Sequence, residues 1–384
     1  MKKDLADETN DDNFLKRLGF GDDFDPNEKP RKAREKHQKM PPTFDTMLET
    51  RPAGDWLSGK TGKPPGKLFG DLWLEGEIAV LFSATATGKS ILATQIAQSI
   101  AKGRSGSPPS KGGVDAPSED GVAAPLGPLE CTAKAQKVLY FDFELTEAQF
   151  AARYSASDAK VRHRFPRNLI RSEICEFDSV PAMFKSNATA FLHHSVIAAI
   201  SETDAKIIII DNITYLTGVG SSPILIMKNL KLLAKNRGLS ILVLAHRSRS
   251  HNRNAISLND LQNQAVLANY ADSVFTIGRS VHAPNFRYVK HLKSRTSEPA
   301  HGASNVIVCR ITKISESDDL TVPPSFLGFQ HLGFSQESDH FPDYFKKLQA
   351  ADDRARKLQL QTRRKANSLY EHILSGQYTR YLNP

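Results

Sequence analysis

The chain has 384 residues, is 40% hydrophobic and carries a formal net charge of +9 at pH 7. It holds no apolar run of about 18 residues, which argues against a membrane-spanning helix. Its three cysteines, Cys131, Cys175 and Cys309, are odd in number and far apart, which argues against a disulfide framework and a structural zinc site.

The first 50 residues are polar and mix acidic with basic side chains, including the basic cluster PRKAREKHQK at residues 30–39. A segment with so few apolar residues cannot bury enough surface to order itself. We therefore expect residues 1–50 to be disordered. The N-terminus also lacks the apolar segment of a secretory signal peptide, so that a reducing cytoplasm is the expected compartment.

Residues 76–101, GEIAVLFSATATGKSILATQIAQSIA, predict a strand, a loop of small residues and a helix in direct succession. This order is typical of a phosphate-binding P-loop, in which backbone N–H groups of the loop and of the first helical turn converge on an anion. Lys89 would then reach the β- and γ-phosphates, and the Ser90 hydroxyl would ligate Mg²⁺. The predicted phosphate cradle consists of Ser83, Ala84, Thr85, Ala86, Thr87, Gly88, Lys89 and Ser90.

After this helix, short β-branched or aromatic runs alternate with helical stretches. Residues 103–134 are rich in Gly, Pro and Ser and predict a disordered surface insertion. Buried strands are predicted at 138–143, 207–210, 241–245 and 274–277, and helices at 147–157, 188–201, 223–236 and 259–270. Runs at 286–292 and 305–311 predict an antiparallel hairpin at one edge. The fold class is therefore α/β, with a mostly parallel central sheet and helices on both faces.

In an open α/β sheet, ligands bind beyond the carboxyl ends of the strands. The run IIIID ends at Asp211, where a carboxylate can hold Mg²⁺ directly or through water. The run VLYFDFE ends at Glu144, which can polarise a water for in-line attack on a γ-phosphate. Asp142 is the competing candidate for this base. Asn212 and Tyr215, which follow the metal carboxylate, can shape the site.

Three further residues are candidates for contact with a γ-phosphate. The run ILVLAH ends at His246, whose ring could sense whether that phosphate is present. Lys293 and Arg295 end a predicted hairpin strand and, being two residues apart, point to the same side of it. Such a pair could reach the phosphates of a neighbouring subunit and stabilise charge on the transferring phosphoryl group.

Two basic segments are candidates for nucleic-acid contact. Arg247, Arg249 and Arg253 lie in a polar loop after the fourth predicted strand end, and its composition predicts a mobile segment. The C-terminal segment, 335–384, is charged and helix-prone, with a basic stretch at Arg354, Arg356, Lys357, Arg363, Arg364 and Lys365. A solvated loop and a solvated helical tail remain the alternatives.

The chain resembles the RecA-like P-loop ATPases in five segments: SATATGKS, YFDFELTEAQ, IIIIDNITYL, VLAHRSRS and KSRTSE. The resemblance spans residues 68–334 and is strongest to the branch with DnaB-type hexameric helicases, KaiC-like ATPases and RepA-like AAA-family ATPases of bacterial mobile elements. It implies an ATPase core at residues 51–334 that uses ATP and Mg²⁺. It also implies a Walker B aspartate at Asp211, a catalytic glutamate at Glu144, a γ-phosphate sensor at His246 and a K-x-R finger, Lys293 and Arg295, acting across subunits.

The resemblance thus predicts a homo-oligomer, with a hexameric ring as one form, that hydrolyses ATP on DNA during replication, mobilisation or recombination of a mobile element. The alternative hypothesis is a nucleotide-dependent switch that turns ATP over slowly and controls a protein partner. A third hypothesis is a non-catalytic adaptor. The sequence has neither the GxGxxG turn of a dinucleotide enzyme nor the G-x-S-x-G elbow of a serine hydrolase.

Overall fold

The computed structural model describes residues 50–57, 64–103, 129, 131–156, 161–174, 181, 184, 188–217, 222–248, 255–262, 264–315 and 323–374. Most of the two segments predicted to be disordered, residues 1–50 and 103–134, falls outside these ranges. So do Cys175 and the loop arginines Arg249 and Arg253.

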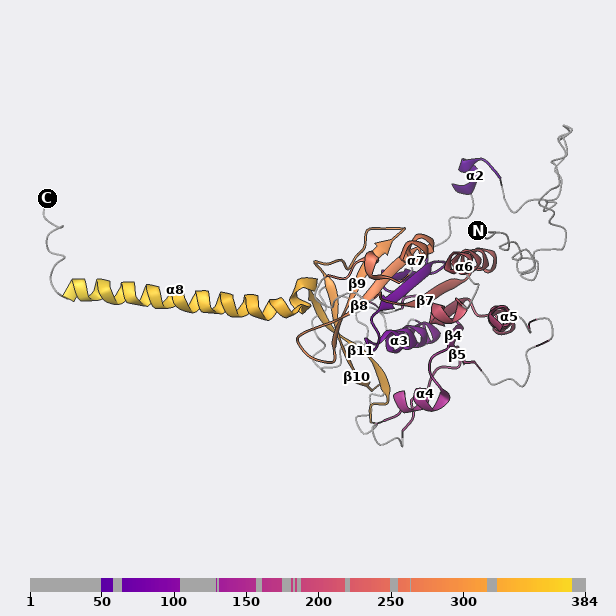
Figure 1. The fold of residues 1–384 in the computed structure, drawn as a ribbon, viewed down its shortest axis with the longest axis horizontal. Coiled ribbons are helices and arrows are strands. Elements are labelled where there is room, and N and C mark those ends of the chain that lie inside the picture. Colours follow the sequence, from indigo (N-terminus) through magenta and orange to yellow (C-terminus); the bar gives the residue numbers. More distant parts are fainter. Residues whose placement is uncertain are drawn as a thin grey trace, which may run out of the picture.

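A nine-stranded sheet forms the centre of the body, in the order β11-β10-β9-β8-β3-β7-β6-β4-β5 (Figure 1). The parallel strands are β3 (Ile78–Ser83), β4 (Val138–Asp142), β5 (Leu169–Ser172), β6 (Ile207–Asp211), β7 (Ser240–His246) and β8 (Ser273–Arg279). Most of these strands are buried along nearly their whole length, as strands covered on both faces must be. The prediction of a mostly parallel α/β sheet is therefore confirmed.

The antiparallel edge is larger than the predicted hairpin. It consists of β9 (Phe286–Ser294), β10 (Val306–Ile314) and β11 (Phe326–Ser335). The sequence of β11 does not predict a strand, because glycines interrupt its apolar pattern. Contacts from the P-loop helix hold it in place: the Gln95 side chain donates to the Phe329 carbonyl at 3.0 Å and accepts from its N–H at 2.7 Å. A separate two-stranded sheet contains β1 (Lys67–Phe69) and β2 (Trp73–Leu74).

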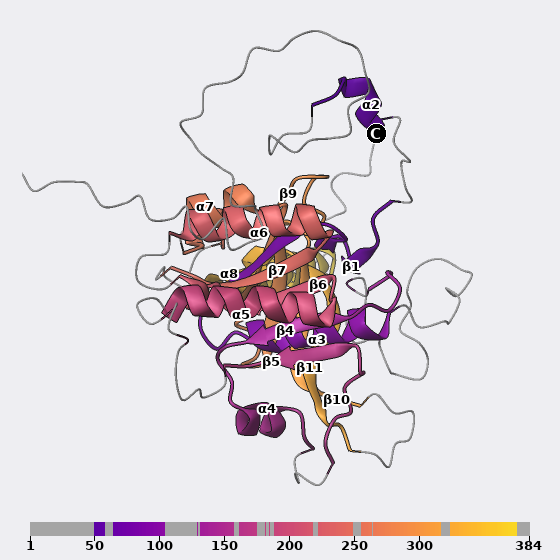
Figure 2. The same cartoon turned by 90° about the vertical axis from the view of Figure 1, so that its right-hand side faces the viewer.

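Helices cover both faces of the sheet, as predicted (Figure 2). Leu92 and Ile96 of the P-loop helix belong to the hydrophobic core of one face. Ile200, Met227 and Leu267 belong to the core of the other face. The helices concerned are α3 (Lys89–Lys102) on the first face and α5 (Ala188–Thr203), α6 (Pro223–Arg237) and α7 (Gln264–Tyr270) on the second. Two further short helices in the described part of the chain are α2 (Ala53–Leu57) and α4 (Glu147–Arg153).

Two predicted helices are shorter in the structure. The helix predicted at 147–157 ends at Arg153, because Ser155 instead forms a bridge with Arg162. The helix predicted at 259–270 begins only at Gln264. A 3₁₀ turn, η4 (Leu258–Asp260), precedes it, and the Asp260 carboxylate accepts from the Ser257 N–H at 2.8 Å. That short turn leaves the chain in extended conformation before α7.

The C-terminal helix α8 (Pro342–Leu374) follows the 3₁₀ turn η5 (Glu337–His340) and has 33 residues. It leaves the body and runs away from it as a single rod about 50 Å long (Figure 1). Its described side chains from 353 to 368 are all exposed. Among the described helices, α8 included, none has an apolar stretch long enough to cross a membrane.

Candidate functional site

The loop after β3 has the form of a P-loop. Gly88 caps α3 with a φ of 108°, a left-handed conformation that favours glycine. A Cβ at this position would also lie only 2.8 Å from Cδ1 of Ile311. Lys89 folds back over the loop, and its Nζ donates to the carbonyls of Ser83 at 3.2 Å and Ala84 at 3.3 Å. The loop is therefore closed on itself around the lysine.

The backbone of this loop presents donors without acceptors. None of the N–H groups of residues 84–88 donates to the backbone of another described residue. Such a row of N–H groups at a helix N-terminus is an anion site, as the sequence predicts. Burial lowers the pKa of Lys89, and the carboxylates of Asp211 and Glu144 oppose this shift, so the lysine charge faces both acids.

Asp211 ends β6 and is 1% exposed. The Tyr140 hydroxyl donates to its Oδ2 at 2.7 Å, whereas Oδ1 is buried without a hydrogen-bond partner in the described part of the chain. Burial raises the pKa of Asp211 to about 6, and the neighbouring hydroxyls of Ser90 and Tyr140 oppose the shift. An orphaned carboxylate oxygen beside a serine hydroxyl has the donor chemistry that Mg²⁺ requires.

Glu144, Asn212 and His246 meet beyond the ends of β4, β6 and β7. The Asn212 amide donates to Glu144 Oε1 and lies 3.2 Å from His246 Nε2. His246 Nε2 is 3.8 Å from the same Glu144 oxygen. Burial lowers the pKa of His246 and the charge of Lys89 lowers it further, so the ring is neutral at pH 7. Asn212, which was predicted only to shape the site, therefore links Glu144 to His246.

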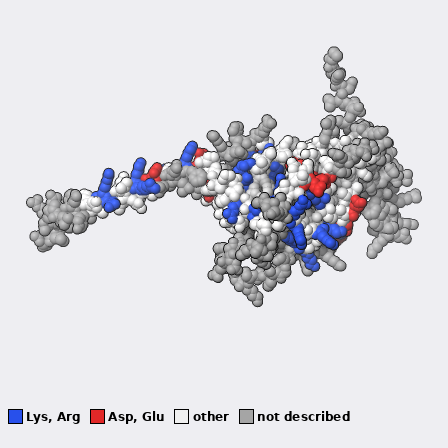
Figure 3. Space-filling model, turned by 90° about the horizontal axis from the view of Figure 1, so that it is seen from below, with Lys and Arg blue, Asp and Glu red and all other residues white. Residues whose placement is uncertain are grey.

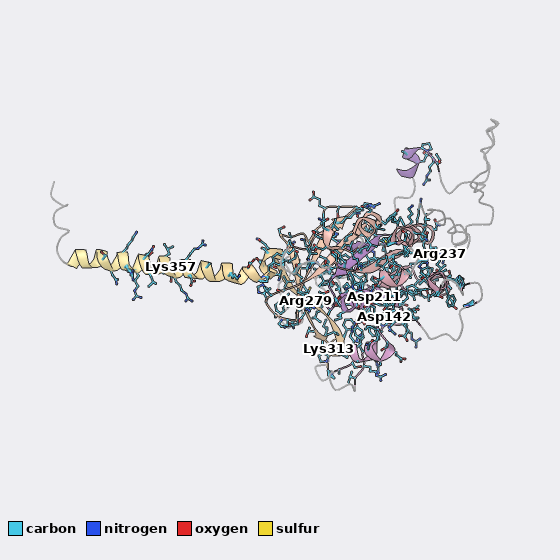
Figure 4. The ribbon with its side chains drawn as sticks, viewed as in Figure 1. Asp142, Asp211, Arg237, Arg279, Lys313 and Lys357 are labelled. Atoms are coloured by element: carbon cyan, nitrogen blue, oxygen red, sulfur yellow. The ribbon has the colours of Figure 1, made fainter. Side chains whose placement is uncertain are left out.

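Asp142, the competing base, is occupied by other contacts. It pairs with Asp211 in the register of β4 and β6, and both are labelled in Figure 4. Its Oδ2 accepts from Arg171 Nε at 2.9 Å, and its Oδ1 accepts from the N–H groups of Glu144 and Leu145 at 3.3 and 3.0 Å. At 2% exposure, this carboxylate holds the turn after β4 rather than a water. The geometry therefore supports Glu144 as the base.

Lys293 and Arg295 lie away from these residues. Ser294, between them, pairs with Ser273 at the start of β8, so both cations are at the amino ends of the parallel strands, opposite the P-loop. Lys293 Nζ donates to the Ala271 carbonyl at 3.0 Å. Arg295 Nη2 donates to the Asn269 carbonyl at 3.0 Å. Within one subunit, this pair cannot reach the phosphate site.

Arg247 is not placed for the predicted contact with DNA. Its side chain is 7% exposed and forms an ion pair with Asp260, with Nη2 3.0 Å from Oδ1. The Ser248 N–H also donates to the Asp260 carbonyl at 2.8 Å. Because its charge is buried and paired, Arg247 fastens the base of the loop, and this placement does not support the predicted contact with nucleic acid.

Two arginines that are not among the predicted site residues contact the P-loop. Arg279 ends β8, and its Nη2 donates to the Ala86 carbonyl at 2.8 Å. Arg287 on β9 donates from Nε to the Thr87 carbonyl at 2.9 Å. Arg279 could have been predicted from the sequence, because it follows a predicted strand at the carboxyl edge of the sheet. Arg287 could not, because its position depends on the register of an antiparallel strand.

A comparison with known protein families agrees with the P-loop motif. A family model described as AAA domain matches residues 46–251, more than half of the chain. Among solved structures, a KaiC-like protein from the hyperthermophilic archaeon Pyrococcus horikoshii OT3 is similar, with 12% identity, 67% of this chain and 90% of that chain covered, and a TM-score of 0.39. No curated protein matches the sequence. The chain belongs to the AAA domain family and is a P-loop ATPase.

Proposed function

We propose that the protein hydrolyses ATP with Mg²⁺ and that Glu144 activates the attacking water. The observation that carries this proposal is the joining of Glu144 to Asn212 and His246 at the same sheet edge as Lys89 and Asp211. A P-loop alone would grip a nucleotide. A partly exposed carboxylate beside it supplies the base that hydrolysis needs.

In the proposed mechanism, the N–H groups of the loop and Lys89 bind the β- and γ-phosphates. Ser90 and Asp211 would hold Mg²⁺, which neutralises phosphate charge when bound. Glu144 accepts a proton from water as the water oxygen attacks the γ-phosphorus in line with the leaving oxygen. Asn212 keeps the Glu144 carboxylate in place, and the neutral His246 offers a hydrogen bond to the γ-phosphate.

Steady-state phosphate release, measured with and without single-stranded DNA, tests this proposal. Turnover that DNA stimulates supports an ATPase acting on DNA. Slow turnover that DNA does not change supports the regulatory switch. ATP binding without turnover supports the non-catalytic adaptor.

We also propose that the chain works as a homo-oligomer, a hexameric ring being one form, in which Lys293 and Arg295 serve the neighbouring subunit. Their place opposite the P-loop of their own subunit supports this arrangement, because a head-to-tail contact brings the two edges together. Arg295 is 53% exposed and is held by Asp272, with Nε 3.4 Å from Oδ1. Its guanidinium is therefore oriented and still accessible.

Mixing two inactive variants tests the shared site. Arg295→Ala and Lys89→Ala should each lose most activity, because one lacks the finger and the other lacks the phosphate-binding lysine. In an equimolar mixture, about one quarter of random interfaces combine an intact P-loop with an intact finger, so activity should return toward that fraction. Arg237→Ala, at the end of α6, is the control and should be fully active alone. A mixture that stays inactive would show that Arg295 does not act across subunits.

We propose that α8 contacts DNA during replication, mobilisation or recombination of a mobile element. Residues 354–370 contain six basic and no acidic side chains. Lys and Arg side chains project from the rod in Figure 3, and Lys357 is labelled in Figure 4. Like charges along a helix repel one another, and a row of phosphates relieves this repulsion.

Buried free thiols at Cys131 and Cys309 suit the proposed reducing cytoplasm.

Salt dependence of binding tests the contact with DNA. Replacing Arg363, Arg364 and Lys365 together with glutamine should reduce the slope of log K against log salt by about 2 on single-stranded DNA. The control is a charge-matched replacement of Lys206, Lys228 and Lys235, exposed residues of the body, which should leave the slope unchanged. An unchanged slope in the α8 variant would exclude these three cations from the DNA contact.

A further inference from the structure

Two arginines lie side by side on adjacent strands of the sheet, next to the P-loop. Arg279 of β8 and Arg287 of β9 are register partners in an antiparallel pair. Each lies two residues from a member of the core that packs on α3, Ile277 in β8 and Val289 in β9. Because side chains alternate along a strand, both arginines point to the face of the sheet that carries the P-loop helix.

Both guanidinium groups bind the outer side of the loop. Arg279 Nη2 donates to the carbonyls of Ala86 at 2.8 Å and Thr85 at 3.4 Å, and Arg287 Nε donates to the Thr87 carbonyl at 2.9 Å. Three consecutive carbonyl oxygens are thereby turned toward the arginines. In a trans peptide, each carbonyl is antiparallel to the next N–H, so the N–H groups of Ala86, Thr87 and Gly88 point the opposite way.

This arrangement costs energy in the absence of a ligand. Like charges directly opposite each other on antiparallel strands destabilise the pair. Burial lowers the pKa of Arg287, and the nearby positive charge of Arg279 lowers it further. Arg287 is 6% exposed and also donates from Nη1 to the Pro284 and Phe286 carbonyls at 2.7 Å. Carbonyl dipoles offset only part of this concentrated charge, which a polyphosphate would neutralise.

We propose that Arg279 and Arg287 are positioning residues that hold the P-loop with its N–H groups turned to the nucleotide, and that the polyphosphate chain balances their paired charge. This inference rests on the proposed function, since it concerns the same nucleotide site. The two arginines would affect nucleotide binding in two ways. They order the loop before the nucleotide binds, and the repulsion between them falls when the phosphates bind.

The exposed Arg279 provides the test, because a variant of the buried Arg287 could fail to fold. Arg279→Met should weaken binding of ADP with Mg²⁺ by about 10- to 100-fold, the effect of losing hydrogen bonds from a charged donor. At saturating ATP, kcat should stay within about twofold while KM rises, because the loop contacts are made equally before and in the transition state. Arg279→Lys keeps the charge without the planar fork and should recover part of the affinity.

Thermal unfolding separates positioning from a purely structural role. Without nucleotide, Arg279→Met should melt at the same or a higher temperature than the parent, because an opposing charge is gone, whereas its gain in Tm on adding ADP should be smaller. Arg310→Met is the matched control: Arg310 lies on the adjacent β10 but bonds Gln330, with Nη2 to Oε1 at 2.6 Å. It should leave ADP binding unchanged.

Three results would overturn the proposal: unchanged ADP affinity, a lower Tm without nucleotide that lysine does not restore, or a fall in kcat at constant KM. The last would make Arg279 a residue that acts in the transition state. If the parent protein binds ADP but does not hydrolyse ATP, the proposed function fails while the binding and melting measurements still decide the role of Arg279.

Discussion

Replacing Lys89 with alanine should lower ATP turnover by about 10²- to 10³-fold, the usual effect of removing one donor that binds developing charge. The loss should exceed that of any exposed lysine, because Lys89 is 8% exposed and fixed over the loop by the carbonyls of Ser83 and Ala84. Without it, the phosphates lose their only cation from α3 near the loop, and the acids Asp211 and Glu144 repel them. ATP binding by calorimetry and phosphate release measure both effects.

Lys228→Ala is the control for this substitution. Lys228 is exposed on α6, and its removal changes the net charge by the same amount. It should bind and hydrolyse ATP as the parent does. Normal turnover by Lys89→Ala would contradict the assignment of the loop as the phosphate site.

Glu144→Gln should keep ATP binding and reduce hydrolysis by about 10²- to 10⁴-fold, the contribution of a general base. Glutamine has nearly the same shape but cannot accept the proton of the attacking water. The loop, Lys89 and Asp211 are untouched, so the substitution separates binding from chemistry. Bound ATP should persist in this variant, as measured by nucleotide retention and phosphate release.

Glu147→Gln, three residues further along, is the matched control and should retain parental activity. Glu147 lies in the exposed first turn of α4, whose cap is formed by Thr146 and Gln149. Asp142→Asn should instead destabilise the fold, because Arg171 would lose a buried ionic partner. If Glu144→Gln hydrolyses ATP at the parental rate, the assigned base is wrong and Asp142 becomes the group to test in a variant that still folds.

The parallel half of the fold was predictable because its strands are continuous apolar runs, such as IIIID before the carboxylate of Asp211. The antiparallel edge was predicted less well. Its last strand, β11, contains Gly328 and Gly333, and it is held by the Gln95 side chain from α3. Such a contact joins residues more than 200 positions apart, and no local pattern in the sequence contains it.

The site shows the same division. Lys89, Asp211, Glu144 and His246 could be proposed because the carboxyl ends of parallel strands meet at one edge. The bridging role of Asn212 could not, since it depends on which way one amide turns after β6. The role of an arginine is equally hard to predict from local sequence. Arg247 follows a strand in a basic segment that is typical of a nucleic-acid contact, yet its burial against Asp260 gives it a structural role.

The central claim is that this chain carries out hydrolysis rather than only binding ATP. Phosphate release from ATP by the parent protein, with Mg²⁺ and then with the metal removed by a chelator, tests it most directly. We predict multiple turnovers with Mg²⁺ and none after chelation, and with Mg²⁺ Glu144→Gln should release phosphate at least about 10²-fold more slowly than the parent. ATP that binds with Mg²⁺ but yields no phosphate, at any DNA concentration, would contradict the account.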